Sequence, residues 1–147
     1  MNIIIAGAGK VGATLADHLA AEGHSVTVVD VSDATLARVS NQLDVMCVKG
    51  NCASQGTLVE AGAADADVVV AATSSDEINL LCGHCAQRLG VPYTVARVRS
   101  AEYSADLESL KRDLGIHMLV NPELAAAVEI SRLLRFPTAA NIDTFAK

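Results

Sequence analysis

Aromatic side chains and long hydrophobic runs are scarce in this chain. Phe, Tyr and Trp make up only 3% of its 147 residues, so the core has to be built from aliphatic side chains. No apolar run approaches the roughly 18 residues that a membrane-spanning helix requires, and we expect no direct membrane insertion. Basic residues are also few: the chain has 11 Lys and Arg and 17 Asp and Glu, which gives a net charge of −6. An acidic chain of this kind argues against nucleic acid as a partner.

Cysteine is present but shows no metal-binding or secretory pattern. The four cysteines are Cys47, Cys52, Cys82 and Cys85. The first residues lack the basic segment of a secretory signal, so we expect reduced thiols in the cytosol. Cys82 and Cys85 share an apolar helical stripe with Ile78 and Leu89, and no second cysteine pair completes a zinc site. We therefore assign these two cysteines to core packing.

Short apolar runs alternate with segments of helical period. The runs span residues 3–6, 26–29, 45–48, 68–71, 93–96 and 117–120. They are continuously apolar, as expected of strands that are buried on both faces of a sheet. Parallel strands need crossover helices, and the intervening segments supply them. The pattern predicts an α/β fold with a doubly wound, parallel, six-stranded sheet in the order 3-2-1-4-5-6.

Capping residues predict where the helices begin and end. The first helix is expected over residues 10–22, ending before Gly23, and Ser32 or Asp33 caps the second. Ser74 and Glu77 fit a capping box for the fourth helix, which ends at Gly90. The fifth helix carries Tyr103 and three leucines and ends at Gly115. Asn121-Pro122 opens the sixth, and Phe136-Pro137 ends it. We expect one domain over residues 1–135 and a linker over 136–147 that leads to a region absent from this chain.

A glycine-rich motif, Gly7-Ala8-Gly9-Lys10-Val11-Gly12, follows the first predicted strand and opens the first helix. This context is the one that a dinucleotide-binding Rossmann fold requires of G-x-G-x-x-G. Gly7 permits the tight turn, Gly9 lets a pyrophosphate approach the backbone, and Gly12 lets helix and strand pack closely. The N–H groups at the helix N-terminus then face the phosphates.

An acidic residue follows at the position that recognises a ribose. Asp30 ends the second predicted strand, 18 residues after Gly12. A carboxylate there accepts hydrogen bonds from the adenosine ribose and repels a 2′-phosphate. NAD or ATP is therefore favoured over NADP. Arg38 offers an alternative partner for a 2′-phosphate, although its helical position favours solvent exposure.

Polar residues end the fourth and fifth strands at the same predicted edge. Thr73, Ser74, Asp76 and Asn79 follow one strand, and Arg97 closes the next. In a doubly wound sheet this edge binds ligands. A cation at Arg97 suits the distal phosphate of a nucleotide. The alternative role for Arg97 is a salt bridge with Asp76 or another nearby acid.

The ordered motifs resemble the RCK (or KTN) family, and in particular the amino-terminal domains of Trk-type regulators of bacterial potassium uptake. The resemblance covers essentially the whole chain. It is carried by residues 1–12, 23–30, 50–53, 72–79, 95–98 and 121–123. Where the family pattern often has an acid after Gly50, this chain has Asn51, which still hydrogen-bonds adenosine but adds no charge.

The resemblance implies a nucleotide ligand and a regulatory role. The implied ligand is NAD(H), with ATP or ADP as alternatives. The implied partners are a membrane potassium transporter subunit and further copies of the chain, in dimers or rings, at the cytoplasmic face of the membrane. The candidate binding residues are Gly7, Ala8, Gly9, Lys10, Val11, Gly12, Asp30, Val31, Gly50, Asn51, Cys52, Thr73, Ser74, Asp76, Asn79 and Arg97.

Two enzyme classes compete with this interpretation. A dehydrogenase needs a region that holds substrate and a general acid or base beside the nicotinamide, and a Tyr-x-x-x-Lys pair is missing because Arg97 and Leu107 follow Tyr93 and Tyr103. A methyltransferase usually has an acidic strand end before its glycine loop, where this chain has Ala6. We therefore expect a sensor rather than an enzyme, with the cofactor domain of an NAD-dependent dehydrogenase as the alternative.

Overall fold

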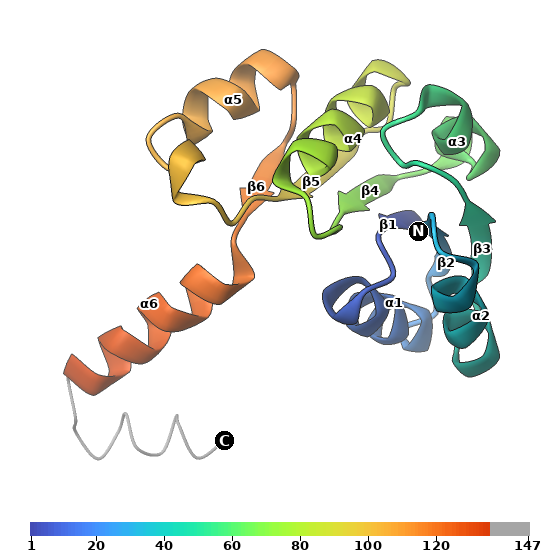
Figure 1. Cartoon of the computed structure of the whole chain (residues 1–147), viewed down its shortest axis with the longest axis horizontal. Coiled ribbons are helices and arrows are strands. Elements are labelled where there is room, and N and C mark those ends of the chain that lie inside the picture. The colour runs from blue at the N-terminus through green and yellow to red at the C-terminus, as the bar shows by residue number, and fades with distance from the viewer. Residues whose placement is uncertain (136–147) are drawn as a thin grey trace.

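The computed structural model describes residues 1–135 and is built around a parallel sheet of six strands (Figure 1). The strands are β1 (Asn2–Ala6), β2 (Ser25–Asp30), β3 (Met46–Lys49), β4 (Val68–Ala71), β5 (Tyr93–Arg97) and β6 (Met118–Val120). Their order is β3-β2-β1-β4-β5-β6, and every neighbouring pair is parallel. The predicted fold class and strand order are confirmed.

The helices cover the two faces of the sheet in two groups (Figure 1). They are α1 (Lys10–Ala21), α2 (Asp33–Gln42), α3 (Gln55–Glu60), α4 (Asp76–Arg88), α5 (Leu107–Leu114) and α6 (Pro122–Arg135). α1 and α2 lie on one face, whereas α3, α4 and α5 lie on the other. The change of face between the two halves leaves β1 and β4 side by side at the centre of the sheet.

Alternation along β1 divides the core into two aliphatic layers. Ile3 and Ile5 belong to a buried cluster with α1 and α2, and Ile4 and Ala6 belong to a second cluster with α3 and α4. All four side chains are almost fully buried. Both faces of the central strand are therefore occupied, which explains why its sequence is continuously apolar.

Several predicted boundaries shift by a residue or more. The N-cap of α4 is Ser75, whose hydroxyl accepts from the Ile78 N–H at 3.2 Å, so the predicted Ser74–Glu77 capping box is wrong. Glu77 instead accepts a hydrogen bond from the Tyr103 hydroxyl. Tyr103 lies in a separate 3₁₀ turn before α5. The predicted helix end at Phe136-Pro137 and the linker over 136–147 lie outside the described residues.

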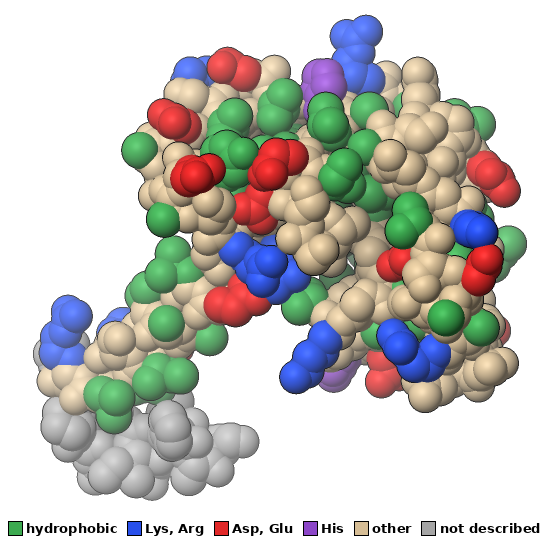
Figure 2. Space-filling view, viewed as in Figure 1, with side chains coloured by type: hydrophobic (Ala, Val, Ile, Leu, Met, Phe, Trp, Pro, Cys, Tyr) green, Lys and Arg blue, Asp and Glu red, His purple; other side chains and the backbone are tan. Residues whose placement is uncertain are grey.

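The sixth helix projects away from the sheet (Figure 1). The Asn121 side chain accepts from the Leu124 N–H at 3.0 Å, so the predicted cap is present. No residue of α6 is buried, and Leu124, Val128 and Leu134 are 56%, 58% and 70% exposed. Hydrophobic side chains accordingly lie along the helix surface in Figure 2. Within residues 1–135, no helix combines the length and the hydrophobicity needed to cross a membrane.

Candidate functional site

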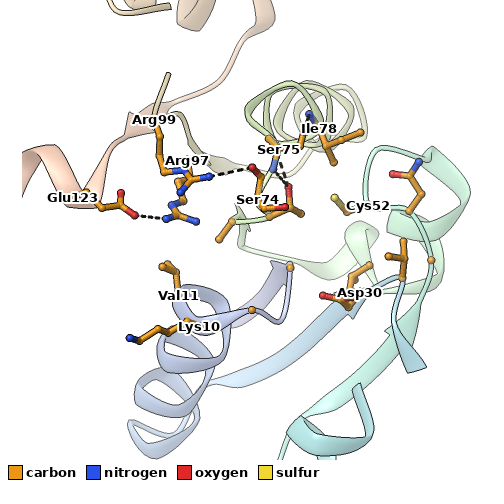
Figure 3. Close-up of a pocket in the computed structure, with 18 residues that line it drawn as sticks. Lys10, Val11, Asp30, Cys52, Ser74, Ser75, Ile78, Arg97, Arg99 and Glu123 are labelled. Carbon is orange, nitrogen blue, oxygen red and sulfur yellow. Dashed lines mark hydrogen bonds and ion pairs between the residues drawn. The ribbon is translucent and has the colours of Figure 1, made fainter. Parts of the chain in front are cut away.

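A cleft of 630 Å³ opens at the carboxyl ends of the central strands. Its size is that of a small-molecule site. The loops after β1, β2, β3, β4 and β5 and the first turn of α6 all contribute to it (Figure 3). It is lined by Gly7, Gly9, Lys10, Val11, Val29, Asp30, Val31, Gly50, Asn51, Cys52, Ala72, Thr73, Ser74, Ser75, Ile78, Arg97, Arg99 and Glu123.

The glycine loop forms the floor of this cleft, and its three glycines meet different constraints. Gly7 has φ +99°, and a Cβ there would lie 2.8 Å from the Ala72 carbonyl oxygen. A Cβ on Gly12 would lie 1.8 Å from the Gly7 carbonyl oxygen. A Cβ on Gly9 would meet nothing within 4 Å. Gly7 and Gly12 are thus required by the fold itself, whereas Gly9 keeps the cleft open.

The first turn of α1 offers hydrogen-bond donors to the cleft. Its N-cap, Gly9, has no side chain to accept from the helix N–H groups. The first N–H groups of a helix have no intrahelical partner, and they carry a partial positive charge. Lys10, next in sequence, is an exposed cation that lines the same cleft. This end of α1 is therefore suited to an anionic group.

Asp30 joins the glycine loop to the end of β2. Its carboxylate accepts from the Ala8 N–H at 2.8 Å and from the Ser32 N–H at 2.9 Å. Its carbonyl oxygen accepts from the Gly50 N–H at 3.0 Å. Each carboxylate oxygen retains a lone pair for a further donor. Asp30 thus holds three loops together and keeps acceptor capacity within the cleft.

The loop after β3 adds a compact wall beside Asp30. A Cβ on Gly50 would lie 2.6 Å from the Thr57 hydroxyl oxygen. The Asn51 side chain accepts from the Ala53 N–H at 2.9 Å, so its amide group remains free to donate. Cys52 follows and is only 4% exposed. Close packing of this loop against α3 sets the width of the cleft here.

Asn79 holds the carboxyl ends of β4 and β5 together. Its side chain is fully buried. The amide oxygen accepts from the Thr73 N–H at 2.8 Å and from the Thr73 hydroxyl at 2.6 Å. The amide nitrogen donates to the carbonyls of Thr73 at 3.1 Å and Arg97 at 2.9 Å. With its hydrogen bonds made inside the protein, Asn79 positions Thr73 and Arg97 and does not line the cleft.

Two arginines stand at the end of the cleft opposite Asp30 (Figure 3). The Arg97 side chain is 11% exposed and forms an ion pair with Glu123 in the first turn of α6. Its Nε is buried and, among the described residues, has no hydrogen-bond partner. Arg99 donates to the Ser74 carbonyl at 3.2 Å. In a chain of net charge −6, this local positive charge favours an anion.

The acid that pairs with Arg97 is Glu123, not Asp76. Both Asp76 carboxylate oxygens accept backbone N–H groups, from Arg99 at 3.0 Å and from Ser100 at 2.8 Å. The pKa of Glu123 is lowered by a hydrogen bond from its own backbone N–H and by its hydrogen bond with Arg97. Asp76 is therefore a structural anchor for the loop after β5, while Glu123 connects the cleft to α6.

The sequence-predicted residues fall into two groups in space. Twelve of them line the cleft, whereas Ala8, Gly12, Asp76 and Asn79 support it from behind. The sequence interpretation missed six lining residues: Val29, Ala72, Ser75, Ile78, Arg99 and Glu123. Glu123 lies within the Asn121-Pro122-Glu123 motif, so the motif itself was the available signal. Among residues 1–135, no cluster of His, Cys, Asp or Glu is arranged to hold a metal ion.

Comparison with known proteins gives matches over nearly the whole chain. The TrkA-N domain family model matches residues 3–122. The Trk system potassium uptake protein TrkA of Haemophilus influenzae is 39% identical over 149 residues, which cover 99% of this chain and 32% of that protein. The protein of the same name from Vibrio alginolyticus is 39% identical over 150 residues, covering 100% and 33%. The chain thus spans about a third of the length of these relatives.

Solved structures share the fold at lower identity. The TrkA-N domain of the Escherichia coli inner membrane protein ybaL has a TM-score of 0.78 at 19% identity, over 90% of this chain and 96% of that one. The Shewanella denitrificans Kef CTD in AMP-bound form has a TM-score of 0.75 at 22% identity, over 99% and 88%. The GsuK channel bound to NAD has a TM-score of 0.68 at 23% identity, over 81% and 21%.

The different constraints on Gly9 and Gly12 give a test of this geometry. Gly12→Ala places a methyl group against the Gly7 carbonyl, and overpacking of this kind costs about 1–3 kcal/mol or more. Gly9→Ala, the matched control, meets open space and changes stability by less than about 1 kcal/mol. Urea unfolding of both variants measures the difference. Equal destabilisation by the two substitutions would contradict the assigned roles.

Proposed function

This chain belongs to the TrkA-N domain family, and from that premise we propose that it is the nucleotide-binding regulatory domain of a Trk-type potassium uptake system. The named relatives are potassium uptake proteins, and the fold is shared with an RCK domain of GsuK at a TM-score of 0.74. We place the domain at the cytoplasmic face of the membrane, where it contacts a transporter subunit. Nucleotide occupancy of the cleft then biases the conformation that the transporter senses.

The proposed ligand is NAD(H), with ATP or ADP as alternatives that share the adenosine end. Asp30 offers acceptors to a ribose, the α1 N-terminus offers donors to the pyrophosphate, and Arg97 and Arg99 stand where a distal phosphate would lie. Two structures with this fold are described as bound to NAD and to AMP. A negative carboxylate at the ribose disfavours a 2′-phosphate, so NADP(H) is the weaker ligand.

The ion pair between Arg97 and Glu123 is the observation that carries the regulatory proposal. Arg97 and Glu123 both line the cleft, and Glu123 belongs to the first turn of the unburied helix α6. A nucleotide phosphate offers Arg97 a stronger, bidentate partner than one carboxylate oxygen. Binding would then release Glu123 and change the preferred orientation of α6. A ligand shifts such an equilibrium only through contacts that differ between the two states, and this contact differs.

The internal contacts of the cleft favour binding over catalysis. The Asp30 carboxylate accepts two backbone N–H groups, and Arg97 and Arg99 are held by Glu123 and by the Ser74 carbonyl. These charges serve structure and ligand recognition. A dehydrogenase fragment remains the competing function, and nicotinamide absorbance against a panel of substrates distinguishes it. We expect NADH to bind without being oxidised.

Self-association completes the proposal, because an apolar groove lies beside the exposed helix. The groove has a volume of 580 Å³ and runs between α1 and the sheet face over β4, β5 and β6. Its apolar lining includes Leu15, Val70, Val95 and Val120. The exposed side chains of α6 are also apolar. We propose that α6 of one copy covers this face of a second copy, which places two clefts in one assembly.

Charge at Asp30 determines the choice between cofactors. Wild-type protein should bind NADH more tightly than NADPH. Asp30→Asn keeps one acceptor oxygen and removes the charge. The ratio of NADPH to NADH dissociation constants should then fall by about tenfold, which corresponds to the loss of one charge-assisted interaction. Asp33→Asn, at an exposed acid that pairs with Lys49 outside the cleft, is the matched control. Calorimetric titration measures all four affinities. A wild-type preference for NADPH would exclude this role of Asp30.

The regulatory proposal is tested by Arg97→Ala in the complete regulator with its transporter. The variant should retain weakened nucleotide binding but lose the difference in potassium flux between ligands, which for typical coupling is about 5- to 150-fold. Arg112→Ala removes an equal charge from the exposed surface of α5 and should leave that difference intact. Flux that still distinguishes ligands in Arg97→Ala would refute the sensing contact. Flux that ignores nucleotide in the wild type would refute the regulatory function.

The surface of α6 is tested by adding one carboxylate to either side of the helix. Leu134→Glu should raise the dimer dissociation constant about tenfold or more, because a charge is desolvated in an apolar contact. Ala125→Glu adds the same group to the opposite side of α6, about 180° around the helix from Leu134, and should have little effect. Sedimentation equilibrium measures both constants. A monomeric wild type at high concentration would rule out this interface for the chain.

A further inference from the structure

Three of the four cysteines converge on one wall of the cleft. Cys52 lies in the loop after β3 and lines the cleft, and Figure 3 shows its side chain beside the N-terminal half of α4. Cys82 and Cys85 come from α4. Cys52 and Cys82 belong to the same buried cluster, at 4% and 0% exposure. The Cys85 thiol donates to the carbonyl of Ala53, the residue next to Cys52, at 3.4 Å.

Cys52 and Cys82 pack in the same buried cluster, and their thiols are electronically unequal. Cys82 donates a hydrogen bond to the Cys52 sulfur, and this lowers the pKa of Cys52 against the opposing effects of burial and of the Asp30 charge. Donation to Cys52 and burial raise the pKa of Cys82. A thiolate is the reactive form of cysteine. The more acidic thiol is therefore the one that lines the cleft, and Cys82 is fully buried in the cluster that the two residues share.

We propose that Cys52 and Cys82 are a redox modification site, in which a peroxide closes a disulfide in the wall of the nucleotide cleft. The Cys52 thiolate attacks one peroxide oxygen, an S–O bond forms, and the O–O bond breaks to release hydroxide, which leaves as water. The Cys82 sulfur then attacks the Cys52 sulfenic acid, and the S–S bond forms as the second water departs with the Cys82 proton. Two thiols are oxidised and one peroxide is reduced to two waters.

The disulfide would act on the cleft through the loop that carries Cys52. Sulfur atoms in a disulfide are about 2.0 Å apart, which is closer than two thiols in hydrogen-bonding contact. Closure therefore draws the loop after β3 toward α4, and Gly50 and Asn51 move with it. Both line the cleft beside Asp30, so oxidation should weaken nucleotide binding, and bound nucleotide should shield Cys52. This consequence rests on the proposed nucleotide-binding function.

The link itself is tested on the purified chain by hydrogen peroxide, alkylation of the remaining thiols and peptide mass mapping. The expected product joins Cys52 to Cys82, and it should form more slowly when NADH is bound. Cys82→Ser should stop at a Cys52 sulfenic acid, which dimedone traps, and Cys82→Ala is a second variant without the thiol. Cys47→Ser, on β3 outside the cleft lining, should oxidise as wild type does.

The consequence is tested by titrating NADH into reduced, oxidised and re-reduced protein. Oxidation should raise the dissociation constant about tenfold, a typical coupling between two sites, and a dithiol reductant should restore it. Cys82→Ser should bind NADH normally and lose the peroxide response. A mapped link to another cysteine, thiols that react only after unfolding, or an unchanged dissociation constant in the linked protein would overturn the proposal. If the reduced protein binds no NADH, the proposed nucleotide-binding function is refuted. In that case the peptide mapping by itself shows whether the Cys52–Cys82 disulfide forms.

Discussion

The common direction of the six strands is the constraint on which the site depends. Because all neighbouring strands are parallel, their carboxyl ends meet at one edge, and the loops that leave them converge there. Asp30 and Asn79 make that convergence rigid. Asp30 joins the loops after β1, β2 and β3, and Asn79 joins the ends of β4 and β5. The cleft is therefore formed before any ligand arrives.

Electrostatics divides this cleft into two ends, which in the proposed function are a recognition end and a responsive end. At the recognition end, Asp30 makes hydrogen bonds to the backbone of the same rigid unit. At the responsive end, Arg97 pairs with Glu123 on a helix that has no buried residue. Figure 2 shows basic and acidic side chains side by side where this helix leaves the domain. In the proposed function, a ligand that takes Arg97 from Glu123 would therefore change little at the first end and much at the second.

The sequence was sufficient for the sheet order and for the glycine loop, because both follow from local patterns of period and of glycine spacing. It placed twelve candidate residues along the cleft. It could not separate Asp76 and Asn79, whose side chains form hydrogen bonds inside the protein, from residues that line the cleft. Nor could it pair Arg97 with Glu123, 26 positions later, or Cys52 with Cys82, 30 positions later. Both pairings depend on how β5, β6 and α4 pack, which no local sequence pattern reveals. The one-residue error at the α4 cap arose because Ser74 and Ser75 are equally good caps by type.

The pKa of the Glu123 carboxyl tests the central claim most directly. In the free chain it is lowered by the hydrogen bonds from its own backbone N–H and from Arg97, so the ion pair persists until the pH falls through that lowered value. Carbon-13 NMR of the glutamate carboxyls, titrated with and without NADH or ATP, follows the group itself. If a nucleotide phosphate takes Arg97, the Glu123 pKa will rise toward its usual value in the complex. A pKa that stays equally low with nucleotide bound would show that Arg97 never leaves Glu123, and would contradict the account.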